Sequence, residues 1–202
     1  GMADSVQTTK SACAEFAAGL DIRTDLGSYD IVRDGKVTEL RSDIVDLFDE
    51  RTVSFLIGSS VSFDGLLAEK GYPAAFGPTI QLTTLACEPV GPFAGNMAVT
   101  IRSFPPAVVQ DVWEFTSHFP GCHGAPIGRN NAAELGINEL DVNMNGHRFE
   151  VPEGTDRLYW ACGITPRIVA EQAKLPFMMS YTPGHAMITD VATQSLYVDS
   201  PG

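Results

Sequence analysis

The chain has 202 residues, of which 44% are hydrophobic and 19% are charged, and its formal net charge is −12. This length and composition predict one globular domain with a buried core, and they exclude a mainly disordered chain. The excess of 25 Asp and Glu over 13 Lys and Arg argues against nucleic acid or an anionic membrane surface as the partner, because both need a cationic face. A small anionic ligand in a local basic pocket is compatible with this charge.

The cysteines and the first residues bear on the cellular compartment. The four cysteines are widely spaced without a C-x-x-C pair, and the residues after Met2 lack the basic and apolar regions of a secretory signal. No run approaches the ~18 consecutive apolar residues that a membrane-spanning helix needs. We therefore expect a cytoplasmic protein with reduced thiols. Gly1, in front of Met2, is typical of a residue left after tag cleavage.

The first half of the chain predicts short strands that alternate with helices. Residues 1–19 are expected to be a flexible lead-in or a short helix, and residues 20–202 a single α/β domain with a smaller lobe within about 90–155. In chain order, the expected elements are a strand over Ser28–Arg33 with a hairpin turn at Asp34-Gly35, a helix over Asp43–Phe48, a strand over Thr52–Ile57 and a helix over Ser62–Lys70 that ends at Gly71.

The second half continues the alternation. The expected elements are strands over Thr79–Leu85 and Asn96–Arg102, a helix from Pro105-Pro106 to about His118, an irregular loop over Phe119–Asn131, a short helix over Ala132–Leu135, strands near His147–Val151 and over Arg157–Cys162, a helix from Thr165-Pro166 to about Lys174, and strands over Phe177–Tyr181 and His185–Asp190. This pattern predicts an α/β layered fold. Thr52–Ile57 and Arg157–Cys162 are apolar on both faces, so we expect both in the central sheet.

Two segments share one design: an apolar strand, a turn with glycine, small polar residues and a helix start. They are FLIGSSVSF (Phe55–Phe63) and WACGITP (Trp160–Pro166). Ligands of open α/β sheets bind at the carboxyl ends of the strands, where helix N-termini attract anions, so the two turns predict a small anionic ligand. The Gly58 turn lacks the Lys-Ser/Thr ending of a P-loop, so nucleotide binding is unsupported. An anion cradle and plain helix capping are equally compatible with it.

Individual side chains add candidates, each with a plainer alternative. Cys162 beside a helix start is either a nucleophile or acid, or a small buried apolar residue. His123 in the irregular loop is an acid/base candidate, whereas a zinc site is disfavoured because the adjacent Cys122 and His123 side chains diverge. His185 and Asp190 stand at odd separation, so one strand would not pair them directly. Arg23 offers either a fork for a carboxylate or a surface ion pair.

Six segments taken together resemble a known family. They are Asp21–Gly35 (DIRTDLGSYDIVRDG), Phe55–Asp64 (FLIGSSVSFD), Phe93–Arg102 (FAGNMAVTIR), Phe119–Ile127 (FPGCHGAPI), Trp160–Pro166 (WACGITP) and Tyr181–Asp190 (YTPGHAMITD). In this order they resemble the hydro-lyase family related to D-glutamate cyclase, a family of long-unknown function, over about residues 20–198. The resemblance implies a mixed-sheet αβα sandwich with a smaller α+β lobe. It also implies cyclising dehydration of D-glutamate to 5-oxo-D-proline.

The resemblance and the residue chemistry together assign a candidate site. The expected catalytic residues are His185, Asp190, Cys162 and His123, and the expected substrate-binding residues are Arg23, Asp25, Ser60, Ser62, Arg102 and Thr165. Such a reaction needs a base, an acid, oxyanion donors and a fork for the spectator carboxylate, but no metal and no redox cofactor. We expect Ser60, Cys162 and His185 to converge on one cleft with His123 above it. The expected partner is a small-molecule carboxylate, and a homo-oligomer is left open.

The chain also departs from the family pattern. The resemblance implies a divergent member, shortened at its N-terminus, with Ser59 in place of a cysteine, Leu82 in place of an arginine, and Gly128 and Tyr181 in place of histidines. Several polar positions have therefore changed together. An alternative function follows from these changes: a catalytically degenerate relative that binds a carboxylate metabolite or acts as an interaction subunit.

Overall fold

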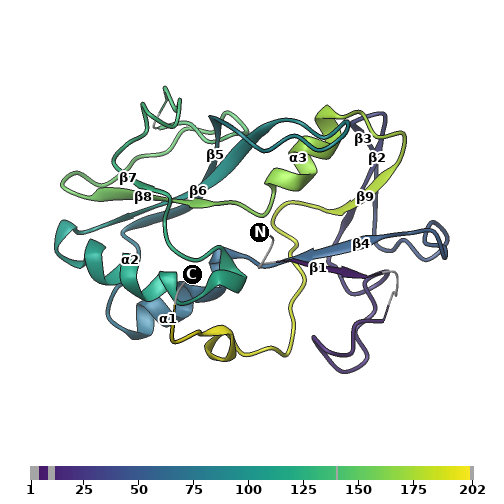
Figure 1. Ribbon diagram of the computed structural model, residues 1–202, viewed down its shortest axis with the longest axis horizontal. Coiled ribbons are helices and arrows are strands. Elements are labelled where there is room, and N and C mark those ends of the chain that lie inside the picture. Colours follow the sequence, from purple (N-terminus) through teal and green to yellow (C-terminus); the bar gives the residue numbers. More distant parts are fainter. Residues whose placement is uncertain (1–4, 9–11, 140, 201–202) are drawn as a thin grey trace.

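The computed structural model describes residues 5–8, 12–139 and 141–200 (Figure 1). Its strands are β1 (Ser5–Thr8), β2 (Tyr29–Arg33), β3 (Lys36–Arg41), β4 (Ser54–Ile57), β5 (Phe76–Ala86), β6 (Asn96–Phe104), β7 (Gly128–Arg129), β8 (Asp156–Ala161) and β9 (Met178–Tyr181). Its helices are α1 (Asp64–Glu69), α2 (Val109–Ser117) and α3 (Thr165–Gln172), with 3-10 turns at Ser60–Phe63, Pro106–Val108, Pro120–Cys122 and Thr193–Leu196. The three helices separate groups of strands in this order, and the combination of sheets and helices confirms the α/β class.

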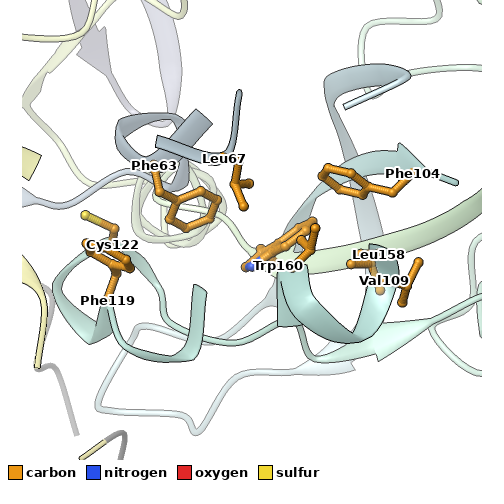
Figure 2. Packing of buried hydrophobic residues seen from close by; sticks show 9 residues of the cluster. Phe63, Leu67, Phe104, Val109, Phe119, Cys122, Leu158 and Trp160 are labelled. Atoms are coloured by element: carbon orange, nitrogen blue, oxygen red, sulfur yellow. The ribbon is translucent and has the colours of Figure 1, made fainter. Parts of the chain in front are cut away.

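The largest sheet has the strand order β5-β6-β8-β7, and its pairings are antiparallel. One face of it carries the main core, in which Leu158 and Trp160 of β8 pack against residues of α1 and α2 (Figure 2). The α3 helix covers Ala98 at the start of β6. On the opposite face, Val99, Ile101 and Tyr159 pack against the turns at residues 132–137. The strand expected over Arg157–Cys162 is therefore an interior strand, as predicted.

A second sheet has the order β3-β2-β9 and begins with the expected hairpin. Asp34 and Gly35 have φ values of 48° and 76°, the left-handed conformation that a two-residue hairpin turn with the favoured twist requires. A Cβ built on Gly35 would overlap the backbone carbonyl of Glu171, so glycine also permits the hairpin to approach α3. The glycine is thus required twice, by the turn and by the packing.

The position of β4 corrects one prediction. β4 pairs with β1 in a two-stranded sheet, and Phe55 is 55% exposed. The apolar run Thr52–Ile57 therefore does not lie in the centre of a covered sheet. An apolar run has two ways to bury its faces, by helices on both sides or by partial cover from several loops, and the sequence pattern does not separate them. Here Leu56 packs against the cluster around Cys13.

Four further elements differ from expectation. Residues 43–48 form a turn in which Asp43 Oδ1 accepts the Val45 N–H at 3.3 Å, instead of a helix. Residues 132–136 are turns, 147–151 contribute only the isolated bridge Val142↔Arg148, and 185–190 are irregular. These short segments make too few backbone hydrogen bonds of their own to define regular structure, so packing decides their shape.

Residues 12–20 form a hydrogen-bonded turn that packs on the rest of the chain. The Cys13 N–H donates to the Leu20 carbonyl at 3.0 Å, and Cys13 is completely buried. Phe16 and Ala17 pack beside it.

None of the described helices combines the length and apolar character needed to cross a membrane. The smaller lobe expected within about 90–155 stays a prediction.

Candidate functional site

The two glycine turns meet in space, and His123 lies against them. A Cβ built on Gly163 would lie 3.3 Å from the Gly58 carbonyl oxygen, 3.4 Å from His123 Nε2 and 3.5 Å from a methyl carbon of Ile57. Three segments that are far apart in the sequence thus touch at one point. We call Gly58, His123, Cys162 and Gly163 the double-turn site. Its residues come from the end of β4, the loop after α2 and the end of β8.

The Gly58 turn is built by two serines with different roles. Ser59 is the N-cap of the following 3-10 turn, and its Oγ accepts the Val61 N–H at 3.3 Å. Ser60 is buried, and its Oγ accepts a hydrogen bond from Arg102 Nη1 at 3.2 Å. Ser62 is exposed on the turn. Because the Ser60 hydroxyl is bonded to Arg102 in the core, the groups of this turn that remain accessible to a ligand are Ser59, Ser62 and the backbone.

The Gly163 turn is fastened to β6 by two groups. The Cys162 N–H donates to the Ala98 carbonyl at 3.1 Å, and Thr165 Oγ1 accepts the Ala98 N–H at 3.0 Å. Thr165 is the first residue of α3 and Ile164 is its N-cap, so the Thr165 side chain does not cap the helix. The hydroxyl holds the helix start against the sheet instead. Cys162 is half-buried and packs beside Ala98 and Ile164.

The loop that carries His123 is a tight turn after α2. The Phe119 carbonyl accepts the N–H groups of Cys122 at 2.8 Å and of Gly124 at 2.9 Å. His123 lies between them with a φ of 75°, in the left-handed region that residues other than glycine rarely adopt. The cost of this conformation, of order 1–3 kcal/mol, is borne by the surrounding packing. The backbone of this loop thus places the His123 imidazole beside the Gly163 turn.

Arg167 forms a buried charged network behind the double-turn site, which the sequence reading missed. Its Nη2 lies 2.6 Å from Asp30 Oδ2, its Nε donates to Glu171 at 2.9 Å, and its Nη1 donates to the Tyr181 carbonyl at 3.0 Å. The available signal was the Arg167–Glu171 spacing of four on a helix. Burial raises the pKa of the Tyr181 phenol, and the charge of the nearby Cys162 raises it further.

His185 lies four residues after Tyr181, beyond the end of β9. Its ring approaches Gly27, where a built Cβ would lie 3.1 Å from His185 Cδ2. The His185 N–H donates to the Thr182 carbonyl at 2.9 Å, so His185 lies one turn beyond Tyr181. Asp190 Oδ2 accepts the Ala18 N–H at 3.3 Å, which connects it to the N-terminal segment. Convergence of His185 with Ser60 and Cys162 stays a prediction.

The remaining predicted substrate-binding residues are engaged with other partners. Arg23 makes a bidentate pair with Asp21, at 2.6 Å for the closer contact, and this bond lowers the pKa of the Asp21 carboxyl. Asp25 accepts the Asp21 N–H at 2.9 Å within the same turn. Arg102 is fully buried and bonded to Asp64 at 2.7 Å. Its guanidinium is part of the core and not an open fork for a substrate.

Two of the family departures have defined surroundings in the structure. A Cβ built on Gly128 would overlap the side-chain amide of Asn131, so a histidine there would require the Asn131 side chain to move. Leu82 is 46% exposed and pairs with Ala98 across β5 and β6. Because the Ala98 carbonyl accepts the Cys162 N–H, the substitution at Leu82 lies one strand away from the Gly163 turn.

Two open surface hollows lie elsewhere, beside β5. The larger, of about 430 Å³, is lined by residues 74–79, 143 and 147–149, and the smaller, of about 240 Å³, by residues 81–82, 136–139 and 142–144. Neither hollow includes a residue of the double-turn site. Among the residues the structure describes, no three His, Cys, Asp or Glu side chains gather as a metal site would need. The double-turn site therefore lies apart from both hollows.

Replacing Gly163 with alanine is expected to impair the site. The new methyl group would lie 3.3 Å from the Gly58 carbonyl oxygen and 3.4 Å from His123 Nε2, so the Gly58 turn has to give way by a few tenths of an ångström, which costs roughly 1 kcal/mol of stability. Urea denaturation measures the loss. Gly65→Ala in α1 is the matched control, because a Cβ there meets nothing within 4 Å; equal behaviour of the two variants would contradict the expectation.

Known proteins resemble this chain over most of its length. The model of the family described as D-glutamate cyclase matches residues 53–190. A Bacillus velezensis protein named "Putative hydro-lyase" is 38% identical over 187 residues, covering 90% of this chain and 71% of the relative. A protein of the same name from Bradyrhizobium sp. (strain BTAi1) is 38% identical over 190 residues, covering 91% and 69%. One from Saccharopolyspora erythraea is 34% identical over 200 residues, covering 96% and 78%.

Proposed function

The chain belongs to the D-glutamate cyclase family, as the resemblance of its motifs predicted, and on that premise we propose that it is a hydro-lyase for a small amino acid. The proposed reaction is the interconversion of D-glutamate with 5-oxo-D-proline and water. The double-turn site is the proposed place of this reaction. The observation that carries the proposal is that His123 Nε2 and the Gly58 carbonyl both lie close to Gly163, since this places an acid/base group beside backbone suited to an anion.

The reaction defines what the site must do. The amino nitrogen forms a bond to the side-chain carboxyl carbon, and a C–O bond of that carboxyl breaks. Two protons leave the ammonium group and two protons leave with the departing oxygen as water. A base, an acid and donors for the tetrahedral oxyanion are therefore sufficient in principle, and we propose that no redox cofactor takes part.

Residues of the chain can fill these roles. His123 is the proposed carrier of the proton between nitrogen and departing oxygen. Ser59 and the backbone N–H groups after Gly58 are the proposed donors to the oxyanion, and the first turn of α3 is the proposed site of the spectator carboxylate. His185 is the proposed second proton carrier with Asp190 as its candidate partner. Cys162 is proposed to line the site beside Tyr181.

Incubation of the purified protein with D-glutamate, and separately with 5-oxo-D-proline, tests the proposal. Chiral chromatography should show both mixtures approaching the same ratio, because an enzyme does not change the equilibrium. L-Glutamate serves as the stereochemical control. If neither compound is converted, the proposed reaction is wrong for this chain.

A second function, binding of a carboxylate metabolite without turnover, follows from the family departures at Leu82, Gly128 and Tyr181, where polar side chains of the family pattern have changed. Because the guanidinium groups of Arg102 and Arg23 are both bonded to carboxylates of the protein itself, such a ligand would have to bind at the backbone N–H groups of the two glycine turns. A ligand that binds only the native state raises the melting temperature by mass action. Stabilisation by D-glutamate or 5-oxo-D-proline without conversion would therefore select the binding function.

A further inference from the structure

We propose that Tyr197 is a positioning residue for His123, acting through the turn at Phe119. Residues 193–198, which we call the C-terminal strap, run beside α1 and end next to the turn after α2 (Figure 1). The strap lies outside the span 53–190 that the family model matches. The inference rests on the proposed function, because it assigns proton transfer to His123.

The strap is attached to the end of α2 by a two-sided contact. The Tyr197 ring stacks on the His118 ring, with centroids 4.6 Å apart and an interplanar angle of 10°. The Val198 N–H donates to the His118 carbonyl at 2.8 Å, and His118 Nδ1 lies 2.7 Å from the Val198 carbonyl oxygen. Backbone and side chain of His118 are therefore both engaged by the strap.

The same tyrosine also contacts the residue that organises the His123 turn. Tyr197 meets the edge of Phe119 with centroids 5.6 Å apart and an interplanar angle of 79°. Phe119 is 1% exposed and belongs to the main core, where its ring centroid lies 6.5 Å from that of Phe63 (Figure 2). Its carbonyl accepts the N–H groups on both sides of His123, from Cys122 and Gly124. Tyr197 thus packs against Phe119, the residue whose carbonyl holds the His123 turn by two hydrogen bonds.

The contact has a consequence for the ring of His123. That residue holds a left-handed backbone conformation, which persists only while its surroundings enforce it. Removing the Tyr197 ring opens one side of Phe119 and lets the turn relax toward ordinary backbone angles. The imidazole would then leave its place against Gly163, and proton transfer would lose alignment while substrate binding at the two glycine turns would change little.

Comparison of Tyr197→Ala with Tyr197→Phe tests this inference. The phenylalanine keeps the ring and so keeps the stack and the edge contact. We expect kcat of Tyr197→Ala to fall about 10- to 100-fold with KM nearly unchanged, and Tyr197→Phe to restore it. Gln194→Ala is the matched control on the same strap, because Gln194 is exposed and offers its backbone carbonyl to Tyr197.

An NMR measurement separates this inference from the proposed reaction. In protein with ¹³C-labelled histidine, His123→Asn identifies the His123 signal, and exposed His147 serves as the internal reference. Tyr197→Ala should shift the His123 signal as well as that of His118, and Tyr197→Phe should leave the His123 signal in place. A His123 signal that is identical in Tyr197→Ala and the unmodified protein would overturn the positioning role, whether or not D-glutamate is converted. If Tyr197→Ala does not fold, Tyr197→Leu, which removes the ring stack on His118 but keeps part of the apolar cover, should give a smaller shift of the His123 signal, and an unchanged signal would again overturn the positioning role.

Discussion

His123→Asn is expected to lower kcat for the D-glutamate reaction by about 10²- to 10⁴-fold, the usual contribution of a positioned acid/base group. Asparagine keeps hydrogen-bonding capacity and tolerates the left-handed backbone at this position, so the fold should persist. Steady-state kinetics measures the loss, and thermal unfolding checks the fold. The effect should fall on kcat more than on KM, because the glycine turns that are proposed to hold the substrate are unchanged.

Two other histidines serve as controls for this result. His147→Asn changes an exposed residue of the 142–148 segment and should leave kcat within about twofold, as surface changes away from special features usually do. His185→Asn distinguishes the two proposed proton carriers. A large loss in His185→Asn with full activity in His123→Asn would move the reaction from the double-turn site toward the Gly27 turn.

Asp64→Ala is expected to lower the free energy of unfolding by about 3–5 kcal/mol, because it leaves the buried Arg102 charge without its carboxylate. Arg102 Nε and Nη2 donate to Asp64 at 2.7 and 3.0 Å, and the guanidinium carbon lies 5.2 Å from the centroid of the Trp160 ring. The ring contact and the remaining hydrogen bond, which Arg102 Nη1 donates to Ser60 Oγ, offset only part of the loss. Urea denaturation measures the change.

Two variants identify the cause of that destabilisation. Asp49→Ala removes the partner of Arg51, which is 85% exposed, and should cost less than about 1 kcal/mol. The double variant Asp64→Leu/Arg102→Met removes both charges and should recover most of the lost stability. If the double variant remained as unstable as Asp64→Ala, the orphaned guanidinium would not be the cause.

Several features of this protein are already determined by short stretches of its sequence. Asp34-Gly35 defines the β2–β3 hairpin because few residue pairs accept two left-handed conformations. Arg157–Cys162 predicts an interior strand because both of its faces are apolar, and Leu158, Tyr159 and Trp160 are fully buried. The family resemblance was also readable, since six motifs occur in the expected order. These signals are local, or depend only on the order of motifs.

Other features were decided by tertiary packing. The apolar run at Thr52–Ile57 lies in a two-stranded sheet because its partner is β1, about fifty residues away in the sequence. Arg102 was expected at a substrate, and its pairing with Asp64 depends on how α1 packs on the sheet. Periodicity reports which faces of an element are apolar, but it does not report which distant element covers them. The candidate site therefore divides in the same way: the two glycine turns were visible in the sequence, whereas their contact with His123 and the cover by Tyr197 exist only in the folded chain.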